Sequence, residues 1–113
     1  MTKIYHNPRC TKSRQALALL EEKNEAIEIV EYLKSQPTKE EITNLVSMLS
    51  IKPLELIRKG EKIFKAEFKD KELSDEQWID AMVAHPILIE RPVVVKNGKA
   101  AIGRPIENVI NIL

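Results

Sequence analysis

Residues 5–14 read YHNPRCTKSR and contain Cys10, which is the only cysteine of the chain. An apolar strand ends before the Asn-Pro pair, because proline fixes φ and pushes the residue before it away from helical geometry. From Thr11 onward, alanine and leucine side chains recur with the spacing of one buried helix face. Cys10 is therefore predicted at the beginning of a helix, where free backbone N–H groups and the helix dipole favour negative charge.

Cys10 is predicted to be a reactive thiol. The helix end, the neighbouring cations Arg9, Lys12 and Arg14, and the nearby His6 all favour a lowered thiol pKa. A lone cysteine is usually a small buried apolar side chain, but a basic strand-to-helix turn is typical of a nucleophile. A lone histidine at a strand end is usually structural, whereas beside Cys10 it is a candidate for orienting or deprotonating the thiol.

The composition predicts a single globular domain over residues 1–113, with 43% hydrophobic and 31% charged residues. No apolar run approaches the roughly 20 residues that cross a membrane, and the N-terminus lacks a signal-peptide pattern, so we expect a cytoplasmic protein without a membrane partner. A net charge of +1 argues against nucleic acid as a partner. Because His6 and His85 are far apart in sequence, we expect no metal.

A single cysteine rules out both an internal disulfide and a dithiol pair within one chain. Ser13 stands where a thioredoxin-type CxxC motif would carry its second cysteine. If Cys10 is oxidised or forms an adduct, the resolving thiol must therefore come from another molecule.

The beginning of the chain predicts a strand at 3–6, a helix over about 11–24 and a β-branched strand at 26–30. A strand, a helix and a strand in this order form a βαβ unit, so the two strands should be parallel.

Residues 36–88 are predicted to form an all-helical insertion. Two capping boxes, 38–41 and 74–77, each open an amphipathic helix. Between them we expect a short helix at 53–58 and a charged, irregular stretch at 59–73. The apolar side chains expected to pack this section are Ile63, Phe64, Phe68, Trp78 and Met82.

The end of the chain predicts a strand at 91–95, a hairpin turn at Asn97-Gly98, a strand at 100–102 and a helix that Pro105 opens. The element order indicates the α/β class: a thioredoxin-like, four-stranded mixed sheet with the helical insertion between strands two and three. In such folds the residue at Pro92 is a cis proline that faces the active cysteine.

Three arginines stand at the ends of predicted elements: Arg58, Arg91 and Arg104. Most arginines are solvated surface charges. If these three converge on the Cys10 thiolate, they form an oxyanion clamp, because a guanidinium pairs bidentately with tetrahedral anions.

Three separated motifs carry a family resemblance: residues 4–10 with Ser13-Arg14, residues 85–95, and residues 103–105. Together they resemble the glutaredoxin/glutathione-linked arsenate reductase family, in order and over essentially the whole chain. Thr11-Lys12 in place of Gly-Thr, and an end at Leu113 without a longer tail, resemble a housekeeping branch with a Cys-Thr-Lys-Ser-Arg motif.

The resemblance implies that Cys10 attacks arsenate and that Arg58, Arg91 and Arg104 hold the oxyanion and its reduced product. It also implies that His6 helps to keep the cysteine ionised. Glutathione would act as thiol co-substrate and form a mixed disulfide with Cys10, glutaredoxin would remove it, and no bound cofactor is implied. The residues expected to form and support the loop are Asn7, Thr11, Ser13, Arg14 and Pro92.

Two alternatives stay open at this point. The chain could be a one-cysteine, glutathione-dependent thiol/disulfide oxidoreductase that acts on another substrate. It could also be a non-enzymatic regulator, since a sister group with the same fold binds RNA polymerase. That group typically uses a CxxC switch, which Ser13 removes here, and it lacks the full arginine set.

Overall fold

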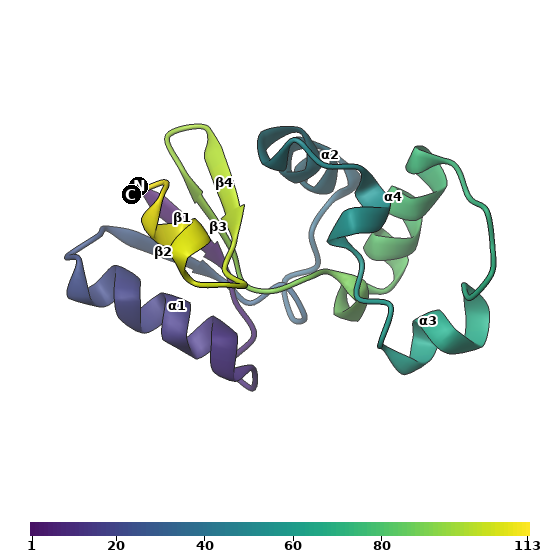
Figure 1. Cartoon of the computed structure of the whole chain (residues 1–113), viewed down its shortest axis with the longest axis horizontal. Coiled ribbons are helices and arrows are strands. Elements are labelled where there is room, and N and C mark those ends of the chain that lie inside the picture. Colours follow the sequence, from purple (N-terminus) through teal and green to yellow (C-terminus); the bar gives the residue numbers. More distant parts are fainter. The chain divides into compact units, whose positions relative to one another are not determined.

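The computed structural model describes residues 1–113, and the chain forms two compact units (Figure 1). The first unit contains residues 1–35 and 91–113, and the second contains residues 36–90. None of the helices has both the length and the apolar character that crossing a membrane requires.

The first unit is built on a four-stranded mixed sheet in the order β2-β1-β3-β4. The strands are β1 (Thr2–Tyr5), β2 (Ile27–Val30), β3 (Val93–Lys96) and β4 (Lys99–Ile102). β1 pairs with β2 in parallel and with β3 in antiparallel orientation, and β3 pairs with β4 in antiparallel orientation. The predicted mixed sheet and its parallel βαβ pair are confirmed.

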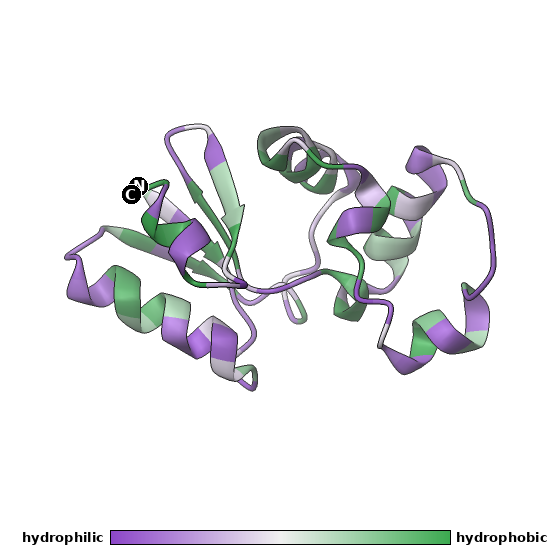
Figure 2. Cartoon of the chain, viewed as in Figure 1, coloured by the Kyte–Doolittle hydropathy of each residue, from purple (hydrophilic) through white to green (hydrophobic).

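Two helices of the first unit, α1 (Thr11–Glu22) and α5 (Glu107–Ile110), share a core with the sheet. Figure 2 shows hydrophobic colour along the strands, whereas hydrophobic and hydrophilic bands alternate along α1. This is the pattern of a helix with one buried face. The core side chains are Ile4, Ala16, Leu20, Val94 and Val109, all fully buried.

The hairpin turn between β3 and β4 is confirmed at Asn97 and Gly98, with φ values of 51° and 76°. Positive φ at both central residues is the requirement of the two-residue turn that Asn-Gly favours. The peptide bond before Pro92 is cis, as predicted, and the bond before Pro105 is cis as well.

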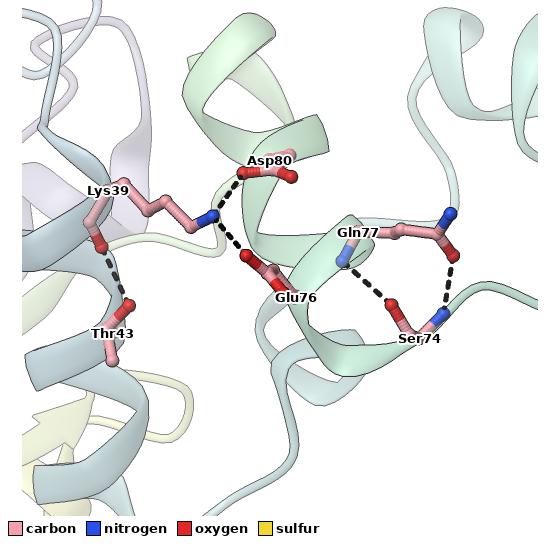
Figure 3. A network of polar contacts seen from close by, with 6 residues as sticks. All are labelled: Lys39, Thr43, Ser74, Glu76, Gln77 and Asp80. Carbon is pink, nitrogen blue, oxygen red and sulfur yellow. Dashed lines mark hydrogen bonds and ion pairs between the residues drawn. The ribbon is translucent and has the colours of Figure 1, made fainter.

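The second unit is helical, with α2 (Lys39–Leu49), α3 (Lys62–Glu67), α4 (Asp75–Ala84) and two short 3-10 helices, η1 (Pro53–Leu56) and η2 (Pro86–Leu88). Both predicted capping boxes are present, at the beginnings of α2 and α4. Lys39 of α2 also pairs with Glu76 at 2.7 Å and Asp80 at 3.1 Å on α4 (Figure 3).

The irregular stretch expected at 59–73 contains a short helix, α3, so this prediction was wrong in part. α3 has no side-chain cap, but the Phe64 ring lies 6.0 Å from the Trp78 ring and 6.3 Å from the Phe68 ring. A helix this short is unstable alone, so these ring contacts stabilise α3. The sequence pattern within residues 59–73 does not indicate them. The helix expected from Pro105, with apolar spacing that continues to Leu113, is shorter, because only Glu107–Ile110 is helical. β3 begins at Val93 instead of Arg91.

Candidate active site

Asn7 folds the loop between β1 and α1. Its side-chain Oδ1 accepts a hydrogen bond from the Arg9 N–H at 3.0 Å, and its carbonyl accepts one from the Cys10 N–H at 3.0 Å. Asparagine side chains commonly bond the backbone two residues ahead in such turns. Cys10 then caps α1 with extended backbone, and its carbonyl accepts the Arg14 N–H at 3.0 Å. Cys10 is therefore at the helix N-terminus, as the sequence predicted.

The Cys10 thiol is held in an environment that favours its thiolate. Burial raises the pKa of Cys10, but the backbone N–H groups of Ser13 and Lys12 and the Arg91 side chain form hydrogen bonds to the sulfur that lower it. The charge of Arg104 lowers it further, so that the pKa of Cys10 lies below its ordinary value. Thiolate is the nucleophilic form of cysteine, and this environment increases its share at neutral pH.

Arg104 follows β4 at the same end of the sheet as Cys10, because Tyr5 pairs with Val93 and Val93 pairs with Ile102. Its Nη2 donates a hydrogen bond to Cys10 Sγ at 3.2 Å, and its Nε donates one to the carbonyl of Arg91 at 2.7 Å. Arg104 is exposed, so a small anion from solution can reach its guanidinium group, whereas Arg91 is half-buried. Two of the three arginines that the sequence singled out are therefore brought together beside Cys10.

His6 and Ser13 form a buried polar pair beneath the loop. His6 Nδ1 lies 2.6 Å from Ser13 Oγ, which also accepts the Asn7 N–H at 3.0 Å. Ser13 is 0% exposed and His6 is 6% exposed. Burial lowers the pKa of His6, the charge of Arg14 lowers it further, and only Glu31 opposes them, so that the ring is neutral at pH 7. The Ser13 hydroxyl donates to Nδ1 of a neutral ring or accepts from it, according to the tautomer.

Arg14 braces the outside of the loop. Its Nη1 donates to the Pro8 carbonyl at 2.8 Å, and its Nη2 donates to Thr11 Oγ1 at 3.2 Å. The remaining support residue, Pro92, lies at the entry to β3, where its carbonyl accepts the Gly103 N–H at 2.9 Å.

Arg58, the third arginine, belongs to the second unit. Its Nε lies 3.8 Å from Glu61 and its Nη1 lies 3.7 Å from Glu90, and its backbone N–H donates to the Leu88 carbonyl at 2.7 Å. Its part in an oxyanion site stays a prediction. No group of three or more His, Cys, Asp or Glu side chains is placed to hold a metal ion.

The sequence predicted free backbone N–H groups at Cys10 but did not identify the two that reach the sulfur, those of Lys12 and Ser13. The signal was present, because the free N–H groups of a helix lie in its first turn. The contact between His6 and Ser13 was also missed. It depends on packing of the end of β1 against α1, which the spacing of residues in the sequence does not reveal.

Comparisons with known proteins match the chain along nearly its whole length. A model of the ArsC family matches residues 5–112. The arsenate reductase of Neisseria meningitidis serogroup A is 42% identical over 113 residues, covering 98% of this chain and 97% of that protein. YfgD of Escherichia coli K12, an uncharacterized protein, is 46% identical over 113 residues, with 98% and 95% covered.

A solved structure gives the same result for the fold. The structure of the arsenate reductase from Vibrio cholerae matches with a TM-score of 0.94 and 44% sequence identity. The match covers 99% of this chain and 97% of that one. The thioredoxin-like α/β fold expected from the order of elements is thereby confirmed.

Proposed function

Because this chain belongs to the ArsC family, we propose that it is an arsenate reductase in which Cys10 is the nucleophile. The observation that carries the proposal is the hydrogen bond of 3.2 Å from Arg104 Nη2 to Cys10 Sγ, on a thiol that Arg91 also contacts. A thiolate at a helix N-terminus between two guanidinium groups can attack an oxyanion and stabilise its added charge. Relatives named arsenate reductase, 42% identical, support this substrate.

In the first step the Cys10 sulfur attacks arsenic. An S–As bond forms, and one As–O bond breaks as the leaving oxygen takes protons from solution and departs as water. Arg91 and Arg104 pair with the remaining arsenate oxygens, because the guanidinium fork fits tetrahedral anions. The amides of the first turn of α1 add stabilisation by the helix dipole.

The second step needs a thiol from outside, since Cys10 is the only cysteine and Ser13 offers no sulfur. The thiolate of glutathione attacks the Cys10 sulfur and forms an S–S bond. The electron pair of the S–As bond passes to arsenic, which leaves as arsenite. Glutaredoxin then exchanges a thiol with the mixed disulfide and frees Cys10.

The other predicted residues have supporting roles in this proposal. Arg58 is a further ligand for the oxyanion and the reduced product. His6 favours the thiolate through Ser13, whose N–H group bonds the sulfur. Asn7, Thr11, Arg14 and Pro92 keep the loop in shape. A free thiolate persists in reducing compartments, which favours the cytoplasm.

One observation favours a second candidate function. A lowered pKa on a half-exposed lone thiol suits attack on a disulfide as well as on an oxyanion. The chain would then be a one-cysteine oxidoreductase that removes glutathione from mixed disulfides. This reaction also needs a thiol from another molecule, because Ser13 stands where a second cysteine would be.

A coupled assay tests the proposal: arsenate, glutathione, glutaredoxin, glutathione reductase and NADPH, with wild type and Cys10→Ser. We expect NADPH oxidation that depends on arsenate and disappears in Cys10→Ser, because the substituted hydroxyl is no thiolate. The control is Lys23→Ala, which removes an exposed cation directly after α1 and should keep full activity. Arsenate-dependent oxidation that survives in Cys10→Ser would sink the proposal.

The same mixture without arsenate and without glutaredoxin, but with a small mixed disulfide of glutathione, tests the second candidate. Cys10-dependent NADPH oxidation there, with none on arsenate, would favour the disulfide reaction over the arsenate reaction.

A further inference from the structure

Gly103 joins the two segments that carry the arginines of the first unit. It directly follows β4, it is buried, and its N–H donates to the Pro92 carbonyl at 2.9 Å. Its φ lies outside the left-handed region, whereas that of Gly98 lies inside it. The backbone conformation at position 103 therefore does not require glycine.

What requires glycine at position 103 is space. A Cβ atom there would lie 2.7 Å from Pro92 Cγ, 3.3 Å from Pro92 Cδ and 3.3 Å from Val109 Cγ2. The shortest of these separations is well inside van der Waals contact. Pro92 is a closed ring that cannot swing aside, and Val109 is fully buried in the core. A side chain at Gly103 would therefore displace Pro92.

Both residues of this contact are direct neighbours of the arginines beside Cys10. Arg91 precedes Pro92, and Arg104 follows Gly103. Arg104 also donates from Nε to the Arg91 carbonyl at 2.7 Å, and from Nη2 to Cys10 Sγ at 3.2 Å. A shift of Pro92 away from Gly103 therefore changes the positions of both guanidinium groups relative to the sulfur.

We propose that Gly103 is a positioning residue for the oxyanion site, because its missing side chain lets Pro92 pack directly against the end of β4. This contact sets the separation of Arg91 and Arg104 and brings both to Cys10. Gly103 itself touches neither substrate nor sulfur. The identity of the bound anion as arsenate rests on the proposed function, whereas the positioning role of Gly103 does not.

The chain offers a matched control. Gly60 is exposed and has nothing within 4 Å of its Cβ position, and no positive φ is recorded for it. Gly60→Ala therefore makes the same chemical change where no atom must move.

The experiment compares wild type, Gly103→Ala and Gly60→Ala. The thiol pKa is read from the rate of iodoacetamide alkylation against pH, which reports Cys10 alone because there is no other cysteine. We expect the Gly103→Ala profile to move to higher pH, and kcat/KM for arsenate to fall about 10-fold or more, since misplacement of about 1 Å can have such effects. Gly60→Ala should match wild type in both readouts.

A folded Gly103→Ala protein with the wild-type alkylation profile would overturn the proposal. If Gly103→Ala does not fold, Gly103→Ala/Val109→Ala replaces it, because this variant removes the 3.3 Å contact and keeps the 2.7 Å contact with Pro92. Its reference is Val109→Ala, and an unshifted profile between these two would overturn the proposal equally. The profile is measured without arsenate, so it decides the role of Gly103 even if wild type does not reduce arsenate.

Discussion

The two units of the chain hold their polar side chains in different ways. The buried polar side chains are Thr2, His6, Asn7 and Ser13, and all of them lie in the first unit. In the second unit the two capping boxes and the ion pairs of Lys39 with α4 are exposed (Figure 3), and the ion pairs of Arg58 with Glu61 and Glu90 are half-buried.

The difference teaches where each kind of contact is useful. A buried polar group must find a partner in one geometry, because leaving it unpaired is costly. Exposed groups exchange their partners for water at little cost. Three of the four buried polar side chains of the first unit, His6, Asn7 and Ser13, lie in or under the loop that holds Cys10, so their contacts fix the loop. The exposed contacts of the second unit specify helix ends and join α2 to α4.

Replacing Ser13 should have the largest effect on stability. Ser13→Ala leaves His6 Nδ1 and the Asn7 N–H buried without their partner, so the free energy of unfolding should fall by about 1–3 kcal/mol. Urea denaturation measures it. The matched control is Ser47→Ala, at an exposed position of α2, which should change stability little. Equal losses of unfolding free energy in the two variants would contradict the difference between buried and exposed polar contacts.

Thr38→Ala should have an intermediate effect. It removes the side-chain oxygen that accepts the Glu41 N–H at 3.1 Å at the beginning of α2, and such a loss typically costs about 1 kcal/mol. Thr43→Ala on the same helix is the control, because Thr43 bonds the Lys39 carbonyl inside the helix, where its removal should be neutral. A larger loss in Thr43→Ala than in Thr38→Ala would contradict the capping role.

Lys39→Met should have the smallest effect. Its ion pairs with Glu76 and Asp80 are exposed and therefore screened by salt. Thermal unfolding should show a slight decrease in Tm at low salt that disappears at high salt. A decrease as large as that of Ser13→Ala, unaffected by salt, would show that the ion pairs carry more of the stability than their exposure implies.

Features with local signals were predictable from the sequence. The capping boxes, the Asn-Gly turn and the βαβ beginning each depend on residues a few positions apart, and each is present. α3 was missed because packing against the Trp78 ring of α4 stabilises it. The last helix was expected to be longer because apolar spacing continues beyond Ile110. Such features depend on packing against other elements, which overrides local preference.

Some features of the candidate site were also predictable from local sequence, and others depend on packing between distant segments. The place of Cys10 at the beginning of α1 follows from Pro8 and the helical pattern after it. The approach of Arg91 and Arg104 was only a hypothesis, because it depends on how β3 and β4 return to β1. The need for glycine at position 103 was invisible, since it arises from Pro92 and Val109.

The hydrogen bond between Arg104 and Cys10 joins residues 94 positions apart, and this has a consequence for the newly made protein. Cys10 is synthesised about 5–20 s before Arg104 at ordinary translation rates. Until then the thiol lacks both arginines and the strand, β3, that aligns them, so it titrates closer to an ordinary cysteine. The lowered pKa of Cys10 therefore depends on side chains from both ends of the sequence and arises only once the first unit has folded.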